Sequence, residues 1–130
     1  MPSEPPPRAL LRTEPAPTTA SPMVVTLTQP VGIADKLTIS YVPDRDILQA
    51  GALAKYIASQ PSLQVFGRET QLEGLAATIA DDFADQVVPR WHRVTLQARN
   101  YVVTVEDRQP GWDHPTLLSS VPRPLRPRRP

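Results

Sequence analysis

A single glutamate, Glu73, has a sequence context in which a carboxylate could bind a ligand. It follows Leu72 and precedes Gly74, in the first turns of an expected helix and next to its apolar stripe. A carboxylate carries two acceptor oxygens, which match a planar donor pair such as a ring N–H and an exocyclic amine. The alternative is a solvated glutamate near a helix N-terminus, where the helix dipole favours a negative charge. The residue types alone favour this second interpretation.

Other residues with catalytic or metal-binding chemistry are few. The chain contains no cysteine, which excludes disulfides, thiolate metal sites and thiol nucleophiles. The two histidines, His92 and His114, form no metal-binding motif, so we expect no metal site. His92 begins an apolar row of an expected strand, which predicts a structural role. The five glycines are scattered, and no Gly-rich phosphate loop is present.

Proline is concentrated at the two ends of the chain. Of the 17 prolines, seven lie in residues 1–22 and six in residues 110–130. Dense proline disfavours helix and sheet because it fixes φ and removes a backbone donor. We therefore predict a disordered Pro-rich tail over residues 1–22, one domain over residues 23–109 and a Pro/Arg-rich C-terminal tail over residues 110–130, extended from about Val121. A core of this size is marginal alone, so we expect a homo-oligomer.

Charge is also distributed unevenly. Residues 23–109 carry eight Lys/Arg and ten Asp/Glu, whereas the last 21 residues carry four arginines against Asp113. This basic run is short and lacks interleaved aromatic residues, so we interpret it as a solvated tail and do not expect nucleic acid as a partner. Prolines occupy the start of the chain where a signal peptide has an apolar run, and no apolar stretch approaches the roughly 18 residues of a membrane span. These features predict a cytoplasmic protein with no membrane partner.

Hydrophobic periodicity predicts the order of the structural elements. Strands are expected over residues 23–27, 37–42, 92–98 and 101–105, with a loop over 28–35 and a hairpin tip at Arg99-Asn100. Helices are expected over residues 49–59 and along the apolar stripe of Leu72, Leu75, Ala76, Ile79 and Phe83. The order strand–strand–helix–helix–strand–strand predicts an α+β fold: a four-stranded antiparallel sheet with both helices on one face.

Four segments, taken in order, resemble motifs of the 7-cyano-7-deazaguanine reductases, which use NADPH to reduce a nitrile to an amine in queuosine biosynthesis. Tyr41-Val42-Pro43-Asp44 followed by Ile47-Leu48 is similar to the family's Y-x-P-D segment. Residues 53–59 are similar to its L-K-L-Y-L-x-S helix, and Pro89-Arg90-Trp91 resembles its D-P-R-W. Glu73 lies 16 residues before Pro89, the spacing of the family's substrate-binding glutamate. The resemblance covers roughly residues 26–106.

This resemblance implies the tunnelling fold (T-fold), in which ββααββ subunits associate into an oligomeric barrel. Members of that fold bind purines or pterins at subunit interfaces. The resemblance also implies that Glu73 binds the substrate, so the expected ligand is a small purine, deazapurine or pterin-like ring.

The chain departs from the family at the nucleophile. With a two-residue gap before Tyr41, Thr28 takes the place of the catalytic cysteine and Asp35 that of the family's acidic residue; without the gap, these places fall on Thr26 and Ile33. A threonine hydroxyl is almost wholly protonated at neutral pH and needs an adjacent base. It is therefore a poor replacement for a thiolate that attacks a nitrile.

Two further family features are missing. The histidine that precedes the family's glutamate is Leu72 here, and the P-R-G-G turn associated with NADPH falls near residues 100–103, which contain no glycine. Arg99 is the nearest candidate for cofactor binding, although it is out of register. NADPH is therefore expected as a cofactor only if reductase activity is retained, and no other cofactor is predicted.

A second family of the same fold is also similar. Residues 72–76 with Ile79-Ala80 look like the I-E-x-L-A…I-A helix of dihydroneopterin aldolases. Those enzymes use a lysine base, and neither Lys36 nor Lys55 is near the end of the last strand, where it would be expected. Three hypotheses follow: a divergent enzyme acting on a deazapurine or pterin, a non-catalytic ligand-binding or structural subunit, and an interaction module whose Pro/Arg tail docks elsewhere.

Overall fold

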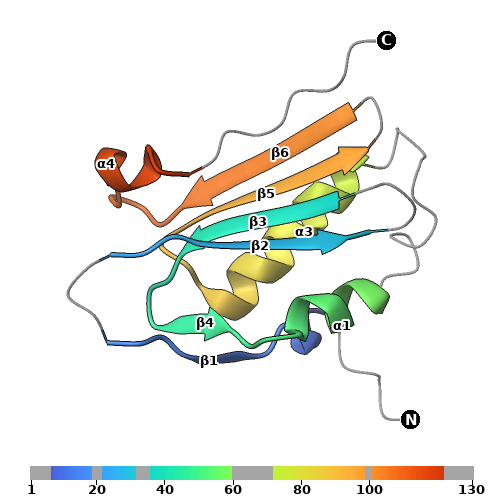
Figure 1. Ribbon diagram of the computed structural model, residues 1–130, viewed down its shortest axis with the longest axis horizontal. Helices are drawn as coiled ribbons and strands as arrows, with labels where there is room; N and C mark the ends of the chain where they lie inside the picture. The colour runs from blue at the N-terminus through green and yellow to red at the C-terminus, as the bar shows by residue number, and fades with distance from the viewer. Residues whose placement is uncertain (1–6, 19–21, 32–35, 60–71, 99–100, 122–130) are drawn as a thin grey trace.

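Four strands form the antiparallel sheet that the sequence predicts. The structure is a computed structural model that describes residues 7–18, 22–31, 36–59, 72–98 and 101–121. The strands are β2 (Val25–Pro30), β3 (Lys36–Val42), β5 (Trp91–Ala98) and β6 (Tyr101–Arg108), and each pairs antiparallel with its neighbour in the order β2-β3-β5-β6 (Figure 1). The central pair β3–β5 joins the two hairpins, which leaves β2 and β6 at the edges.

Strand β2 extends further than the sequence predicts. Thr28, Gln29 and Pro30 pair with residues 36–38 of β3, so the expected loop over residues 28–35 is wrong for residues 28–30. An edge strand can include a proline, because the side that faces away from the sheet needs no hydrogen-bond donor. Residues 32–35 and the expected hairpin tip at residues 99–100 lie outside the described residues.

Alternation along the strands gives the sheet two different faces. Leu37, Ile39 and Tyr41 of β3 and Val94 and Leu96 of β5 are almost completely buried and belong to one apolar cluster. Their cross-strand neighbours Leu27, Val103 and Val105 pack against the same cluster. Because successive side chains of a strand point to opposite faces, the residues between them form the other face. We call the first the helix face and the second, which is rich in threonine, the hydroxyl face.

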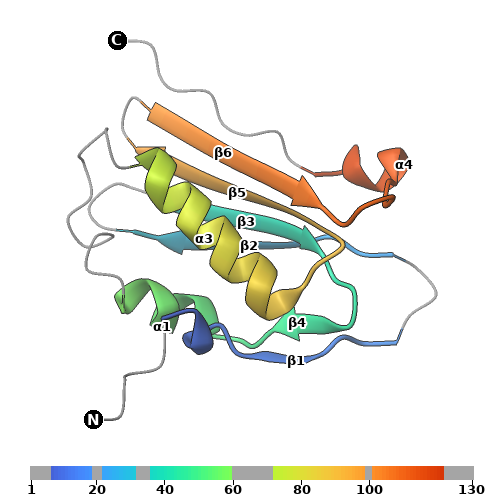
Figure 2. The same cartoon turned by 180° about the vertical axis from the view of Figure 1, so that it is seen from behind.

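The two expected helices, α1 (Ala52–Ala58) and α3 (Leu72–Val87), both contribute to the core of the helix face. The longer helix, α3, lies across that side of the sheet (Figure 2). Its predicted apolar stripe is confirmed, since Leu72, Ala76, Ile79 and Phe83 are at most 2% exposed. Phe83 meets the Tyr41 ring edge-on, with 5.0 Å between the ring centroids. None of the described helices is long and apolar enough to cross a membrane.

The N-terminal segment folds onto the domain, so the expectation of disorder over residues 1–22 is wrong for residues 7–18. It forms a short 3₁₀ helix, η1 (Pro7–Leu10), and strand β1 (Thr13–Pro15), which pairs with β4 (Asp46–Leu48). Leu11 is 1% exposed and lies in the main core cluster. Prolines disfavour regular secondary structure in this segment, but burial of the Leu11 side chain stabilises its folded position on the domain.

The beginning of the C-terminal region is also folded. Helix α4 (Pro115–Leu118) follows β6, and Val121 is buried with Val42 and Trp91 in a second apolar cluster. Trp91 is completely buried, which explains why the chain turns back after β6 instead of continuing as a tail from residue 110. Residues 122–130, with the four arginines, lie outside the described residues.

Candidate functional site

Glu73 lies where helix α3 meets the edge strand β6. It is the second residue of α3, its side chain is exposed, and its carboxylate oxygen Oε1 accepts a hydrogen bond from the Tyr101 hydroxyl. Tyr101 is the first residue of β6 and packs against the main core cluster. Among the described residues, a Cβ atom added to Gly74 would meet no heavy atom within 4 Å other than its chain neighbours and the backbone of its own helix.

The hydrogen bond stabilises the negative charge of this site. Donation from the Tyr101 hydroxyl, with a smaller contribution from the backbone N–H of Glu73, holds the pKa of Glu73 below its usual value. The carboxylate is ionised at neutral pH, as an exposed glutamate ordinarily is, and the hydrogen bond extends its ionised range to lower pH. Because Tyr101 contacts one oxygen, the second oxygen of the carboxylate keeps its capacity to accept hydrogen bonds.

Thr28, the candidate for the position of the nucleophile, lies elsewhere. It is exposed on β2, at the other edge of the sheet, and on the hydroxyl face rather than the helix face. Three strand spacings separate β2 from β6, which is about 14 Å. No described histidine or carboxylate forms a hydrogen bond with the Thr28 hydroxyl. Within one subunit the structure therefore does not bring Thr28 and Glu73 together.

The other sequence candidates divide into two groups. Thr26, the alternative position for the nucleophile, also lies on the hydroxyl face, where its hydroxyl is 3.1 Å from that of Ser40. Asp35 and Arg99 lie outside the described residues, so their placement relative to Glu73 stays a prediction.

His92 has the structural role that the sequence predicts. It is 4% exposed and its ring lies 6.0 Å from that of Phe83. Burial lowers the pKa of His92, against the smaller opposing effect of the carboxylates of Asp107, Asp81 and Glu106. Within the described parts of the chain, no group of three or more His, Asp or Glu side chains could hold a metal ion.

The hydroxyl face carries an arrangement that the sequence analysis did not identify. Thr28, Thr38, Thr95 and Thr104 form one continuous cross-strand row, with one threonine from each strand. The Thr95 and Thr104 hydroxyls are 3.3 Å apart. The alternation of polar residues was visible in each strand, but the row depends on the register of all three pairings, which a single sequence does not show.

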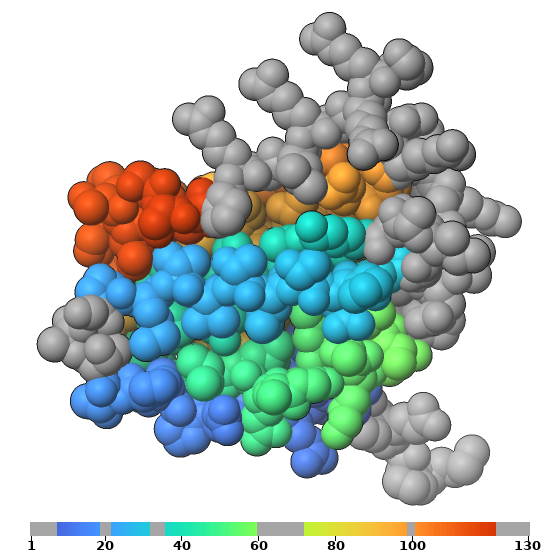
Figure 3. Space-filling view, viewed as in Figure 1, coloured from blue at the N-terminus to red at the C-terminus, as the bar shows by residue number. Residues whose placement is uncertain are grey.

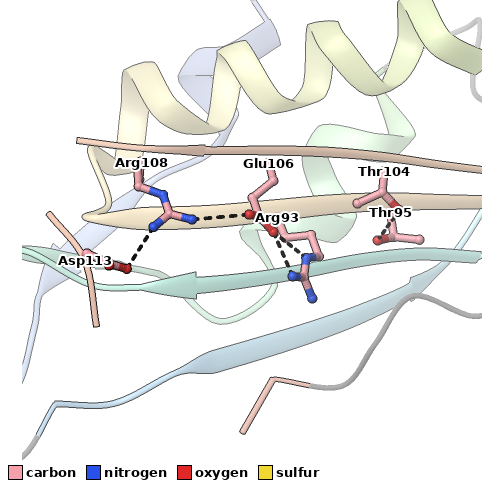
Figure 4. A network of polar contacts seen from close by, with 6 residues as sticks. All are labelled: Arg93, Thr95, Thr104, Glu106, Arg108 and Asp113. Atoms are coloured by element: carbon pink, nitrogen blue, oxygen red, sulfur yellow. Dashed lines mark hydrogen bonds and ion pairs between the residues drawn. The ribbon is translucent and has the colours of Figure 1, made fainter. Parts of the chain in front are cut away.

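An ion-pair network continues this face toward the C-terminal region. Arg93 Nη2 lies 2.7 Å from Glu106 Oε1, and Arg108 contacts both Glu106 and Asp113. These side chains lie on the side of the strands away from the long helix (Figure 4). The Arg93 guanidinium also lies over the Trp91 ring, 5.1 Å from its centroid, so the network connects β5, β6 and the segment before α4.

Comparison with known proteins identifies a distant similarity. No family model matches the chain. Over an alignment of 84 residues the chain is 31% identical to the NADPH-dependent 7-cyano-7-deazaguanine reductase of Syntrophus aciditrophicus. This alignment covers 61% of this chain and 56% of that protein. Over 91 residues it is 31% identical to the protein of the same description from Acidithiobacillus ferrooxidans, covering 65% and 60%. The resemblance read from the motifs is confirmed at this level, and the chain spans less than two thirds of the length of these relatives.

Proposed function

We propose that this protein binds a purine, deazapurine or pterin-like ring through Glu73, and that it has diverged from NADPH-dependent nitrile reduction. The observation that carries the proposal is the exposed, ionised Glu73 carboxylate, which Tyr101 orients at the junction of α3 and β6. A planar ring with two adjacent donors fits a carboxylate whose charge is fixed in this way. The distant similarity to the reductases supports the choice of ring.

The binding site is proposed to lie between copies of the chain. Among the described residues, β2 and β6 each have a neighbouring strand on one side only, and an unpaired edge is a liability unless something covers it. Pairing of β6 with β2 of a second copy would close both edges and bring a second subunit close to Glu73. We therefore propose that residues 23–109 form a T-fold domain, onto which residues 7–18 and 110–121 fold, and that this domain assembles into a closed homo-oligomeric barrel.

Catalysis of nitrile reduction requires groups that this chain lacks. It contains no cysteine to form a covalent thioimide with a nitrile, and Thr28 has no base among the described residues. Asp35 and Arg99 are kept as proposed catalytic and cofactor-binding residues, and NADPH as a cofactor only for a protein that still reduces a nitrile. The absence of a thiol also favours a second candidate function, a non-catalytic subunit that binds the ring without changing it.

Calorimetric titration with guanine, 7-deazaguanine and neopterin tests the ring site. Charge-assisted hydrogen bonds contribute roughly 1.5–3 kcal/mol each, so Glu73→Gln should weaken the cognate ring at least about tenfold. Glu14→Gln is a matched control, because Glu14 is an exposed glutamate of β1 without an ion pair among the described residues. Native mass spectrometry of the same samples would report the number of subunits. Equal affinity in the wild type and Glu73→Gln would remove the proposed anchor.

A further inference from the structure

A small pocket lies between the N-terminal segment and helix α1. Its volume is about 170 Å³, and it is lined by Leu10, Arg12, Gln49, Ala50, Ala52 and Lys55. The N-terminal segment and α1 are neighbours along one edge of the molecule (Figure 3). None of these residues belongs to the proposed ring site, so the pocket is a separate feature.

The described residues that line this pocket include two cations and no carboxylate. Arg12 and Lys55 are both exposed, and neither forms an ion pair with a described residue. By contrast, four of the six described arginines, at positions 8, 90, 93 and 108, pair with aspartate or glutamate. Helix α1 has no acidic residue in its first turn, so that turn adds no negative charge to the pocket.

Backbone hydrogen bonds fix the two chain segments that carry these cations. The Gln49 N–H donates to the Arg12 carbonyl at 2.9 Å, which extends the β1–β4 pairing by one more hydrogen bond. The neighbouring Leu11 is anchored in the core. Lys55 is part of α1, where its N–H donates to the Gly51 carbonyl at 3.2 Å. Both cations therefore come from ordered segments of the chain that line the same pocket.

We propose that this pocket, the Arg12–Lys55 pocket, binds phosphate, either as the free ion or as the terminal group of a phosphate monoester. The planar guanidinium of Arg12 can donate two parallel hydrogen bonds to phosphate oxygens, and the ammonium of Lys55 adds a second charge. The amide of Gln49 supplies a neutral donor. One water occupies about 30 Å³ in the liquid, so the pocket has room for a phosphate group and some of its water.

Titration of the full chain with inorganic phosphate and with phenyl phosphate, at constant ionic strength, tests this assignment. Chemical shifts of the Arg12 and Lys55 side chains report saturation. Arg12→Gln and Lys55→Gln should each weaken phosphate binding about threefold or more, as expected for exposed charge pairs, and the double variant should not bind. Tighter binding of phenyl phosphate would identify a monoester as the ligand, whereas equal binding would identify the free ion.

Two matched variants control for net charge. Arg45→Gln and Lys36→Gln remove exposed cations that do not line this pocket, and they should bind phosphate like the wild type. Melting curves check that all variants are folded. Phosphate binding that does not saturate in the wild type, or an equal loss in Arg45→Gln and Arg12→Gln, would overturn the proposal. Both outcomes are independent of the ring site, because Glu73 is unchanged in every variant.

Discussion

Tyr101 donates a hydrogen bond to Glu73 and thereby joins the first residue of edge strand β6 to the second residue of helix α3. The two residues are 28 positions apart, and the contact exists because α3 packs across β5 and β6. The candidate ligand-binding carboxylate is consequently held by the sheet as well as by its own helix.

Replacing Tyr101 by phenylalanine should raise the pKa of Glu73 toward its ordinary value. The folded-state pKa of Glu73 is lowered mainly by this hydrogen bond. Its contribution to stability is therefore present above the unfolded-state pKa and is lost as pH falls through the folded-state pKa. NMR titration of the Glu73 carboxyl carbon in wild type and Tyr101→Phe measures the shift. Identical titration curves would show that the hydrogen bond does not lower the pKa of Glu73.

Leu11→Ala should destabilise the protein strongly. Leu11 is 1% exposed in the main core cluster, and truncation of a buried leucine typically costs about 2–5 kcal/mol. Arg8→Ala is the control from the same segment. It removes an exposed ion pair with Asp85, at 3.4 Å, and should cost about 1 kcal/mol or less. Urea unfolding measures both, and a Leu11→Ala variant as stable as the wild type would mean that the N-terminal segment is not part of the fold.

Val88→Gly should stabilise the protein. Val88 follows the last turn of α3 with φ of 50°, and its N–H donates to the Ala84 carbonyl at 3.1 Å, as at a left-handed helix C-terminus. A left-handed backbone costs a residue with a Cβ about 1–2 kcal/mol, and the greater unfolded-state entropy of glycine offsets part of that gain. Val88 is 54% exposed, so little packing is lost, and we expect a net gain of about 0.5–1 kcal/mol.

Thermal and urea unfolding measure this gain. Val88→Ala is the control, since alanine keeps a Cβ and therefore keeps the strain. A glycine variant no more stable than the alanine variant would contradict the interpretation of Val88 as a strained helix end.

His92 should make the stability of the protein depend on pH in the weakly acidic range. Burial lowers the pKa of His92 in the folded state, so the unfolded chain binds its proton more readily. Stability is full above the unfolded-state pKa, about 6.5, and decreases as pH falls from there toward the folded-state pKa. His92→Phe, next to Phe83, removes the titrating group and should flatten the pH dependence of the urea midpoint. An unchanged slope in this variant would assign the pH dependence to other groups.

The sequence predicted the elements whose evidence is local. The apolar stripe from Leu72 to Phe83 predicted α3, because helical periodicity is visible in one segment of chain. Glu73 was identified as a candidate from its residue type and from its distance to Pro89, which matches the spacing in the reductases that the chain resembles. Its partner Tyr101 could not be predicted, because that contact depends on how α3 packs on β6.

The incorrect predictions for residues 7–18 and 28–30 also arise because the deciding contacts are made with other strands. Leu11 lies among prolines and arginines, and its burial becomes evident when β1 has a partner, β4, more than thirty residues away. Thr28 was assigned to a loop because Pro30 and Gly32 follow closely, but the edge position of β2 tolerates that proline.

The row of four threonines has a consequence for how the chain avoids misfolding. In each strand a hydroxyl-bearing residue alternates with an aliphatic one, so a slip of one residue in any hairpin would exchange the two sets. Such a slip between β5 and β6 would turn Thr104 and Glu106 toward α3 and expose Val103 and Val105 to water. The misregistered sheet would separate these polar groups from their partners and place them against apolar side chains, which costs free energy. The alternation of polar and aliphatic residues therefore favours the native strand register over slipped registers during folding.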